Sequence, residues 1–147
     1  MNNEFMNSGN VKQAVPFFMV TNMDSSINFY VERLGFVIKH QWEPRGKIEW
    51  CWLQFDHASL MLQEYRQNLP AGKSGEGVSV YFICEDALAI YNHIVSNGLL
   101  APEPFVGNNM WVVGLTDPDG YKIFFESPTD VPEKTVFSNW IKTNKPN

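Results

Sequence analysis

A turn sequence and an alternating strand pattern adjoin near the end of the chain, in Thr116-Asp117-Pro118-Asp119-Gly120-Tyr121-Lys122-Ile123-Phe124-Phe125-Glu126-Ser127-Pro128. Pro118 fixes φ for a tight turn, and Gly120 tolerates the positive φ that closes such turns. In the strand that follows, Lys122, Phe124 and Glu126 share one face. We predict a hairpin whose last strand carries the Glu126 carboxylate on a mostly apolar face.

The composition indicates one globular domain, with two half-size units as an alternative. The chain has 147 residues, 44% of them apolar and 14% aromatic, which is enough to bury a full core. The net charge is -5 and no Lys/Arg cluster is present, which argues against a nucleic-acid partner. No stretch approaches the roughly 20 apolar residues that cross a bilayer, and the polar start lacks a leader pattern. We expect a cytoplasmic protein without a membrane partner, whose acidic excess would favour a cationic ligand.

The first half of the chain has the pattern of a β-α-β-β-β unit. Asp24-Ser25-Ser26 offers N-cap chemistry for a helix, and Gly35 supplies its stop. Apolar alternation predicts four strands around this helix, at residues 14–20, 36–42, 48–55 and 58–65.

The second half repeats this order after a polar linker. The predicted elements are a strand at 77–83, a helix at 85–97 that ends at Gly98, and strands at 99–106, 110–116 and 121–127. We divide the chain into a flexible lead-in, a first module, a linker, a second module and a tail with a short helix, at residues 1–12, 13–66, 67–76, 77–128 and 129–147.

One offset aligns the two halves. The helix-ending glycines Gly35 and Gly98 differ by 63 (98 − 35). The same offset pairs Val15 with Val78 and Met61 with Phe124, without a gap. The halves therefore look like two copies of one structural unit.

Two motifs carry a family resemblance. Asn22-Met23-Asp24-Ser25-Ser26-Ile27-Asn28-Phe29-Tyr30-Val31-Glu32-Arg33-Leu34-Gly35-Phe36 resembles the first helix signature of the vicinal oxygen chelate superfamily, which includes glyoxalase I, bleomycin resistance proteins, fosfomycin resistance proteins and extradiol dioxygenases. Asp117-Pro118-Asp119-Gly120-Tyr121-Lys122-Ile123 is similar to that family's closing hairpin. The resemblance covers about residues 14–128. It implies an α+β fold of two tandem βαβββ modules that form a curved sheet cup with helices outside, assembled as a homodimer.

The metal positions implied by the resemblance carry unsuitable side chains. Metal-using members place His or Glu on the first and last strand of each module, and these positions fall here on Val15, Met61, Val78 and Phe124. Val and Phe have no donor atom, and a Met thioether prefers soft metals. We expect no metal and no cofactor.

The other metal-ligating residue types do not supply an alternative. His40, His57 and His93 do not form a ligand spacing, and Cys51 and Cys84 lie in apolar strand patterns typical of buried thiols. Glu126 is a weak candidate for acid–base chemistry, because no partner residue can be identified.

An aromatic and apolar set is expected to line the cup. The offset places Trp50, Trp52 and Trp111 on equivalent faces, and indoles on one face form a flat wall for planar or cationic groups. Strand parity alone does not say which face lines the cup, so these side chains could instead pack against a helix. The predicted pocket residues are Phe17, Met19, Trp50, Trp52, Met61, Val78, Val80, Trp111, Phe124 and Glu126.

Three functions remain open from the sequence. The first is a homodimeric protein, similar to bleomycin resistance proteins, that binds a small planar or cationic molecule without chemistry. The second is a glyoxalase-type lyase or a dioxygenase that uses a divalent metal. The third is a dimeric structural or regulatory protein whose cup is filled by its own side chains.

Overall fold

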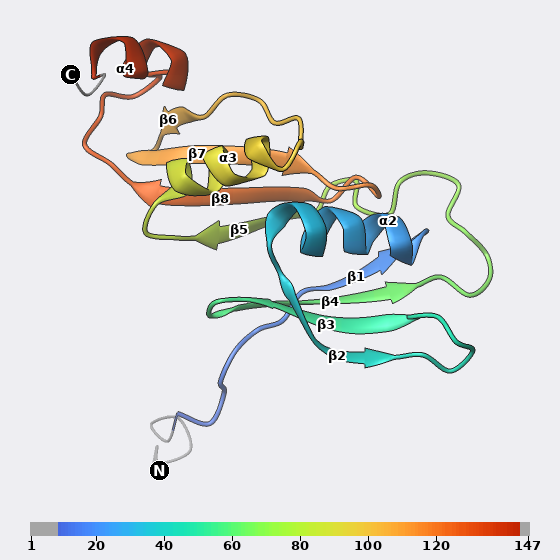
Figure 1. Ribbon diagram of the computed structural model, residues 1–147. Coiled ribbons are helices and arrows are strands. Elements are labelled where there is room, and N and C mark those ends of the chain that lie inside the picture. The colour runs from blue at the N-terminus through green and yellow to red at the C-terminus, as the bar shows by residue number, and fades with distance from the viewer. Residues whose placement is uncertain (1–8, 145–147) are drawn as a thin grey trace.

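The computed structural model describes residues 9–144, and its first half is a β-α-β-β-β unit (Figure 1). Its sheet has the order β1-β4-β3-β2, with β1 parallel to β4 and the other neighbours antiparallel. The elements are β1 (Phe17–Val20), α2 (Met23–Ile27), the π-helical segment η1 (Asn28–Leu34), β2 (Val37–Trp42), β3 (Trp50–Phe55) and β4 (Ala58–Glu64). Residues 1–8 of the predicted lead-in and residues 145–147 of the tail lie outside the described residues.

The second half repeats the topology in a sheet with the order β5-β8-β7-β6. Its elements are β5 (Ser79–Ile83), α3 (Ala87–Ser96), β6 (Phe105–Gly107), β7 (Met110–Thr116) and β8 (Lys122–Pro128), and α4 (Phe137–Thr143) follows. The predicted α+β fold with two βαβββ units is confirmed. Among the described residues, no helix is long and apolar enough to cross a membrane.

The first helix begins earlier than its sequence suggests. Asn22 is the N-cap, with extended backbone at φ -145, and its side chain accepts a 3.0 Å hydrogen bond from the Ser25 N–H. The Asp24-Ser25-Ser26 stretch already lies within the helix, so the prediction that it supplies the cap is wrong. Gly35 ends the helix at φ 105, a conformation that favours glycine.

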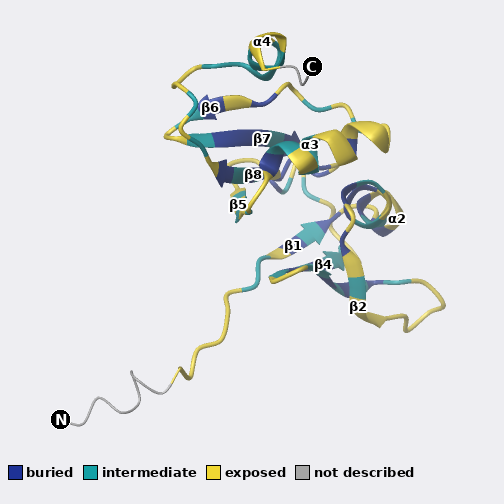
Figure 2. Ribbon diagram, turned by 60° about the vertical axis from the view of Figure 1, so that its left-hand side comes forward, coloured by how far each residue is buried: buried dark blue, intermediate teal, exposed yellow. Residues whose placement is uncertain are grey.

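Aromatic side chains join the two units into one core. In Figure 2, β7 is largely buried, whereas much of α3 is exposed. The two units meet through three ring pairs, with centroids 3.8, 5.7 and 6.4 Å apart: Phe18–Tyr121, Phe36–Phe82 and Phe55–Phe125. The two units are therefore packed on each other and not merely linked.

The internal repeat holds at an offset of 63 only in part of each sheet. Met61 of β4 pairs with Phe17, and Phe124 of β8 pairs with Tyr81. Met61 and Phe124 differ by 63 (124 − 61), but Phe17 and Tyr81 differ by 64 (81 − 17). The gap-free match of Val15 with Val78 is therefore wrong, because the first strands are displaced by one residue.

The third strands are displaced in the other direction. Gln54 pairs with Ser59 and Thr116 pairs with Lys122, so β3 and β7 correspond at an offset of 62 (116 − 54). The cause is the connecting turn: four residues, 55–58, separate the first pair, whereas five residues, 117–121, separate the second. A shift of one residue turns every side chain of a strand to the opposite face.

Candidate functional site

Each sheet has one face in the core and one face that residues 9–144 leave open. In the first sheet, the open face is built along a row of direct cross-strand partners, because partners in register point to the same side. Phe17 pairs with Met61, Met61 with Trp52, and Trp52 with His40. We call this surface the first open face; it comprises Phe17, Met19, His40, Trp42, Trp50, Trp52, Met61 and Gln63.

Three tryptophans lie on the β2–β3 side of the first open face. Trp50 and Trp52 lie two residues apart on β3, and Trp42 is the direct cross-strand partner of Trp50. Trp42 is 44% exposed, and the Arg66 guanidinium lies 4.8 Å from the centroid of its ring. The wall therefore already holds one flat cation by the attraction between a positive charge and the face of an indole.

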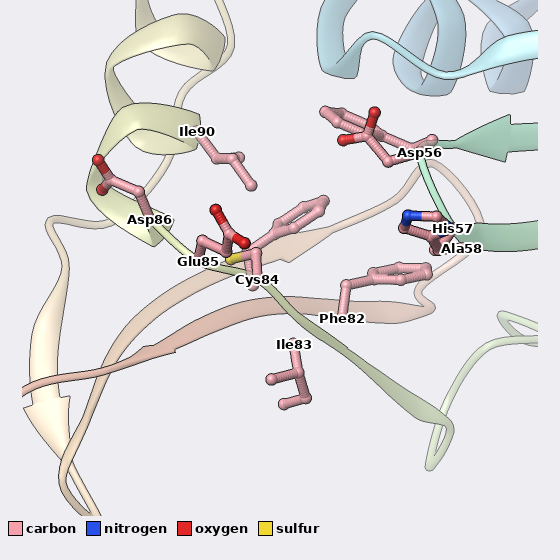
Figure 3. A pocket seen from close by; sticks show the side chains of 11 residues that line it. Asp56, His57, Ala58, Phe82, Ile83, Cys84, Glu85, Asp86 and Ile90 are labelled. Carbon is pink, nitrogen blue, oxygen red and sulfur yellow. The ribbon is translucent and has the colours of Figure 1, made fainter.

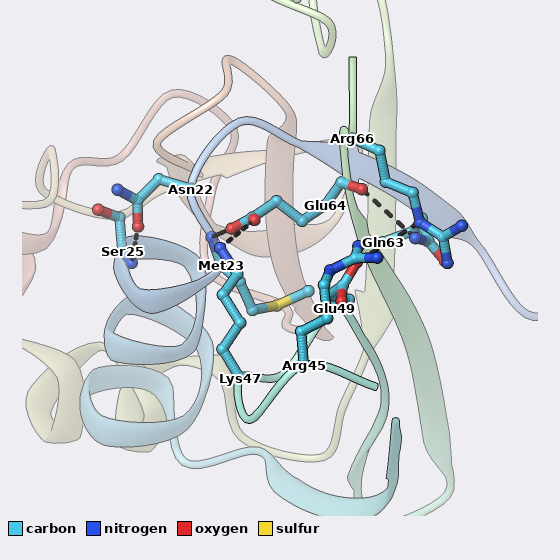
Figure 4. A network of polar contacts seen from close by, with 9 residues as sticks. All are labelled: Asn22, Met23, Ser25, Arg45, Lys47, Glu49, Gln63, Glu64 and Arg66. Atoms are coloured by element: carbon cyan, nitrogen blue, oxygen red, sulfur yellow. Dashed lines mark hydrogen bonds and ion pairs between the residues drawn. The ribbon is translucent and has the colours of Figure 1, made fainter. Parts of the chain in front are cut away.

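A polar network fixes Arg66 beside this wall (Figure 4). The buried Glu49 carboxylate pairs with Arg66 at 3.4 Å and accepts a hydrogen bond from Arg45. Arg66 is half-exposed, so its charge is anchored at one end by Glu49 and lies against Trp42 at the surface. A ligand with its own cationic group would compete with Arg66 for Trp42.

Glu64 ties the same edge of the sheet to the first helix. It accepts hydrogen bonds from the Met23 N–H at 2.7 Å and from Lys47. Burial alone would raise the pKa of Glu64, but the hydrogen bonds from Lys47 and Met23 outweigh it and lower the pKa below its ordinary value. Glu64 is therefore an ionised structural anchor at neutral pH.

The second sheet carries a smaller aromatic surface, which we call the second open face. It comprises Tyr81, Ile83, Phe105, Val112, Phe124 and Glu126. Tyr81 is 54% exposed and stacks on Phe124, with centroids 4.7 Å apart. Gly114 is the partner of Phe124 on β7, and a Cβ there would lie 3.0 Å from the Phe124 ring, so glycine lets the ring lie flat on the strand. Glu126 shares this face with Phe124, as the strand alternation predicts.

The predicted pocket set is therefore divided between two surfaces. Phe17, Met19, Trp50, Trp52 and Met61 lie together on the first open face. Phe124 and Glu126 lie together on the second open face.

Three predicted pocket residues lie elsewhere. Trp111 is on the core side of β7, 5% exposed, with its ring 5.5 Å from that of Trp140 in α4. Val80 also packs against the core, and Val78 precedes β5 and is 39% exposed. The expectation that Trp111 occupies a face equivalent to that of Trp50 and Trp52 is wrong, because the third strands correspond at 62 and not 63.

Seven residues of the open faces were not predicted as pocket residues: His40, Trp42, Gln63, Tyr81, Ile83, Phe105 and Val112. Trp42 and His40 reach the first open face beyond a register shift between Ile38 and His40, which simple alternation does not reveal. Tyr81 reaches the second open face because β5 is displaced by one residue. The signal that could have found Trp42 is its position: Trp42 and Trp50 flank a connection that contains Pro44-Arg45-Gly46, and hairpin partners share a face.

The four positions to which the resemblance assigns metal ligands carry side chains that do not fit a hard divalent ion. Met61 and Phe124 lie on strands β4 and β8, and Val15 and Val78 precede β1 and β5; none offers an oxygen or nitrogen side-chain donor. Among residues 9–144, no three or more His, Cys, Asp or Glu side chains are grouped so as to hold a metal ion.

A cavity of about 620 Å³ lies between the two units, apart from the first open face (Figure 3). It is formed by the β3–β4 turn of the first unit and by the end of β5 and the start of α3 in the second. Cys84 lines it and donates a 3.3 Å hydrogen bond from Sγ to the Glu126 carbonyl oxygen. Burial, followed by the charge of Asp86, raises the pKa of the Cys84 thiol, so it is neutral and a weak nucleophile at neutral pH.

The fold and the sequence together identify the family. Residues 12–125 match the family model of the Glyoxalase/Bleomycin resistance protein/Dioxygenase superfamily. The chain belongs to this superfamily. Among curated proteins, no sequence matched this glyoxalase-superfamily chain.

Solved structures of the superfamily share its architecture. A bleomycin-binding protein complexed with bleomycin has a TM-score of 0.64 at 23% identity, over 80% of this chain and 98% of that one. A bleomycin resistance determinant encoded on transposon Tn5 has a TM-score of 0.64 at 24% identity, over 82% and 100%. TnmS3, an antibiotic binding protein from Streptomyces sp. CB03234, has a TM-score of 0.60 at 20% identity, over 80% and 97%. These similarities concern the fold.

Proposed function

We propose that this glyoxalase-superfamily protein binds a small planar or cationic organic molecule against the tryptophans of the first open face, without a bound metal. The observation that carries the proposal is the Trp42–Trp50 pair with the Arg66 guanidinium resting on Trp42. Indole faces attract flat and cationic groups. Structural neighbours that bind bleomycin and other antibiotics give further support.

We further propose that the binding groove is completed by a second copy of the chain. Both open faces carry exposed large apolar side chains, among them Phe17, Trp42, Tyr81 and Ile83. Surfaces of this kind are commonly covered by a partner. If the second open face of one copy lay opposite the first open face of another, Glu126 would supply a carboxylate that can pair with a ligand amine.

Fluorescence titration tests the binding proposal. We expect planar cations to quench tryptophan fluorescence saturably, and Trp52→Ala to weaken binding by about tenfold, a typical cost of losing one aromatic anchor. Trp140→Phe, on the far side of the second sheet, is the matched control and should leave affinity unchanged. Flat titrations across planar cations would contradict the proposal.

Light scattering tests the assembly. If the protein is a dimer, and if Tyr81→Asp or Phe17→Asp lowers the affinity between the two copies, the result would support the pairing of the two open faces. A monomer that still binds ligand would contradict the second-copy groove and leave the tryptophan site intact. A dimer that binds no ligand would favour the structural or regulatory function.

A further inference from the structure

The cavity between the two units has an apolar floor. Phe55 comes from the first unit, Phe82 and Phe125 come from the second, and Ile90 reaches in from α3. The Phe82 and Phe125 rings are stacked with centroids 5.4 Å apart, and Phe55 lies 6.4 Å from Phe125. Phe55, Phe82 and Ile90 are only partly buried, so apolar surface remains available inside the cavity.

The rim of the cavity is acidic. Asp56 projects from the β3–β4 turn and Glu85 from the segment after β5, so the two carboxylates flank the cavity from different units (Figure 3). Within residues 9–144, neither carboxylate takes part in a hydrogen bond or an ion pair, whereas Asp86 caps α3 through Ala89 N–H. The described lining contains no Lys or Arg, and its one basic side chain is His57, next to Asp56. The cavity thus combines negative charge with an aromatic interior.

We propose that this cavity is a second binding site, for a small organic cation that has an apolar or aromatic body and one ammonium group. Its volume of about 620 Å³ is in the range of small-molecule sites. The body would lie on Phe55, Phe82 and Ile90, and the ammonium would lie between Asp56 and Glu85. The site is separate from the tryptophans of the first open face and goes beyond the function proposed for them.

The test uses two probes of similar shape and different charge. Phenethylammonium and 2-phenylethanol are titrated into the full-length protein, and backbone amide shifts are followed by NMR. We expect phenethylammonium to shift amides of residues 55–58 and 82–86, and to bind more tightly than the alcohol. The double variant Asp56→Asn with Glu85→Gln should lower the affinity for phenethylammonium about three- to tenfold, as expected for the loss of two partly solvated charges. Its affinity for 2-phenylethanol should stay within twofold of wild type.

Two further variants keep the proposal falsifiable. Ala58→Leu narrows the cavity without a change of charge and should lower the affinity for both probes. Glu76→Gln removes an exposed carboxylate that does not line the cavity and should leave the affinity for both probes unchanged. Equal weakening of both probes by the carboxylate variant, or shifts confined to residues 40–52, would overturn the proposal. Shifts at residues 40–52 would leave the tryptophan site standing, so the two proposals fail separately.

Discussion

The Tyr30 hydroxyl donates a 2.7 Å hydrogen bond to Asp117 Oδ2 and so connects the first helix to the last hairpin turn, 87 residues away. Both side chains are buried. The other oxygen of Asp117 accepts hydrogen bonds from the N–H groups of Asp119 and Tyr121 at 2.8 and 2.9 Å. One carboxylate therefore shapes the turn and joins the two units.

Removal of the Tyr30 hydroxyl should destabilise the protein. Tyr30→Phe leaves a buried Asp117 oxygen without its donor, which costs about 1–3 kcal/mol in the free energy of unfolding. Urea denaturation measures this loss. Tyr81→Phe, which removes an exposed hydroxyl, is the control. A loss below about 0.5 kcal/mol, the usual range for surface substitutions, would mean that the bond does not hold the units together.

The same carboxylate should make stability depend on pH. Burial, the largest effect, raises the pKa of Asp117, although hydrogen bonds from Tyr30 and two backbone N–H groups oppose it. The folded state therefore holds this proton more tightly than the unfolded state, so the contribution of Asp117 falls as pH rises from about 4 through the raised pKa. The melting temperature of wild type relative to that of Asp117→Asn should therefore be highest in acid and fall as pH rises through that window, because Asn does not titrate. A difference that is constant with pH would contradict the assignment.

The linker is held by a close backbone approach at Gly75. A Cβ on Gly75 would lie 2.1 Å from the Tyr121 backbone nitrogen, and the Gly75 N–H donates to the Asp119 carbonyl oxygen at 3.0 Å. Gly75→Ala must displace the backbone, so we expect the free energy of unfolding to fall by more than about 2 kcal/mol. Gly72→Ala is a matched control in the same linker, since a Cβ there meets nothing within 4 Å. Thermal unfolding of both variants checks the prediction, and equal stability would contradict it.

Metal analysis separates the binding proposal from a metal-dependent enzyme. Freshly purified protein, incubated with Ni²⁺, Mn²⁺ or Fe²⁺ and then desalted, should retain far less than one metal per chain, because Met61 and Phe124 offer no hard donor. Elemental analysis gives the ratio. Near-stoichiometric retention would make the lyase or dioxygenase function the leading one.

The sequence predicted the fold because its strongest signals are local. The alternation of residues 110–116 matches β7. Gly35 ends the first helix in a left-handed conformation that glycine adopts readily. The strand expected at residues 99–106 is shorter, and β6 begins only at Phe105, after Pro102 and Pro104. Proline cannot donate to a strand ladder, so this segment stays outside the sheet.

The open faces were harder to predict because they depend on register. One additional residue in the β7–β8 turn is enough to send Trp111 into the core, while Trp42 joins the first open face across a bulge. Neither effect leaves a trace in residue periodicity. Pairing between strands, and not alternation along them, decides which side chains meet.

The three ring pairs between the units have a consequence for synthesis. The first repeat leaves the ribosome with Phe18, Phe36 and Phe55 unmatched, so its packing is completed only when Tyr121, Phe82 and Phe125 have followed. Each half thus completes the folding of the other. The Phe18 and Tyr121 rings stack with centroids 3.8 Å apart, so a substitution at either position changes the packing of the other.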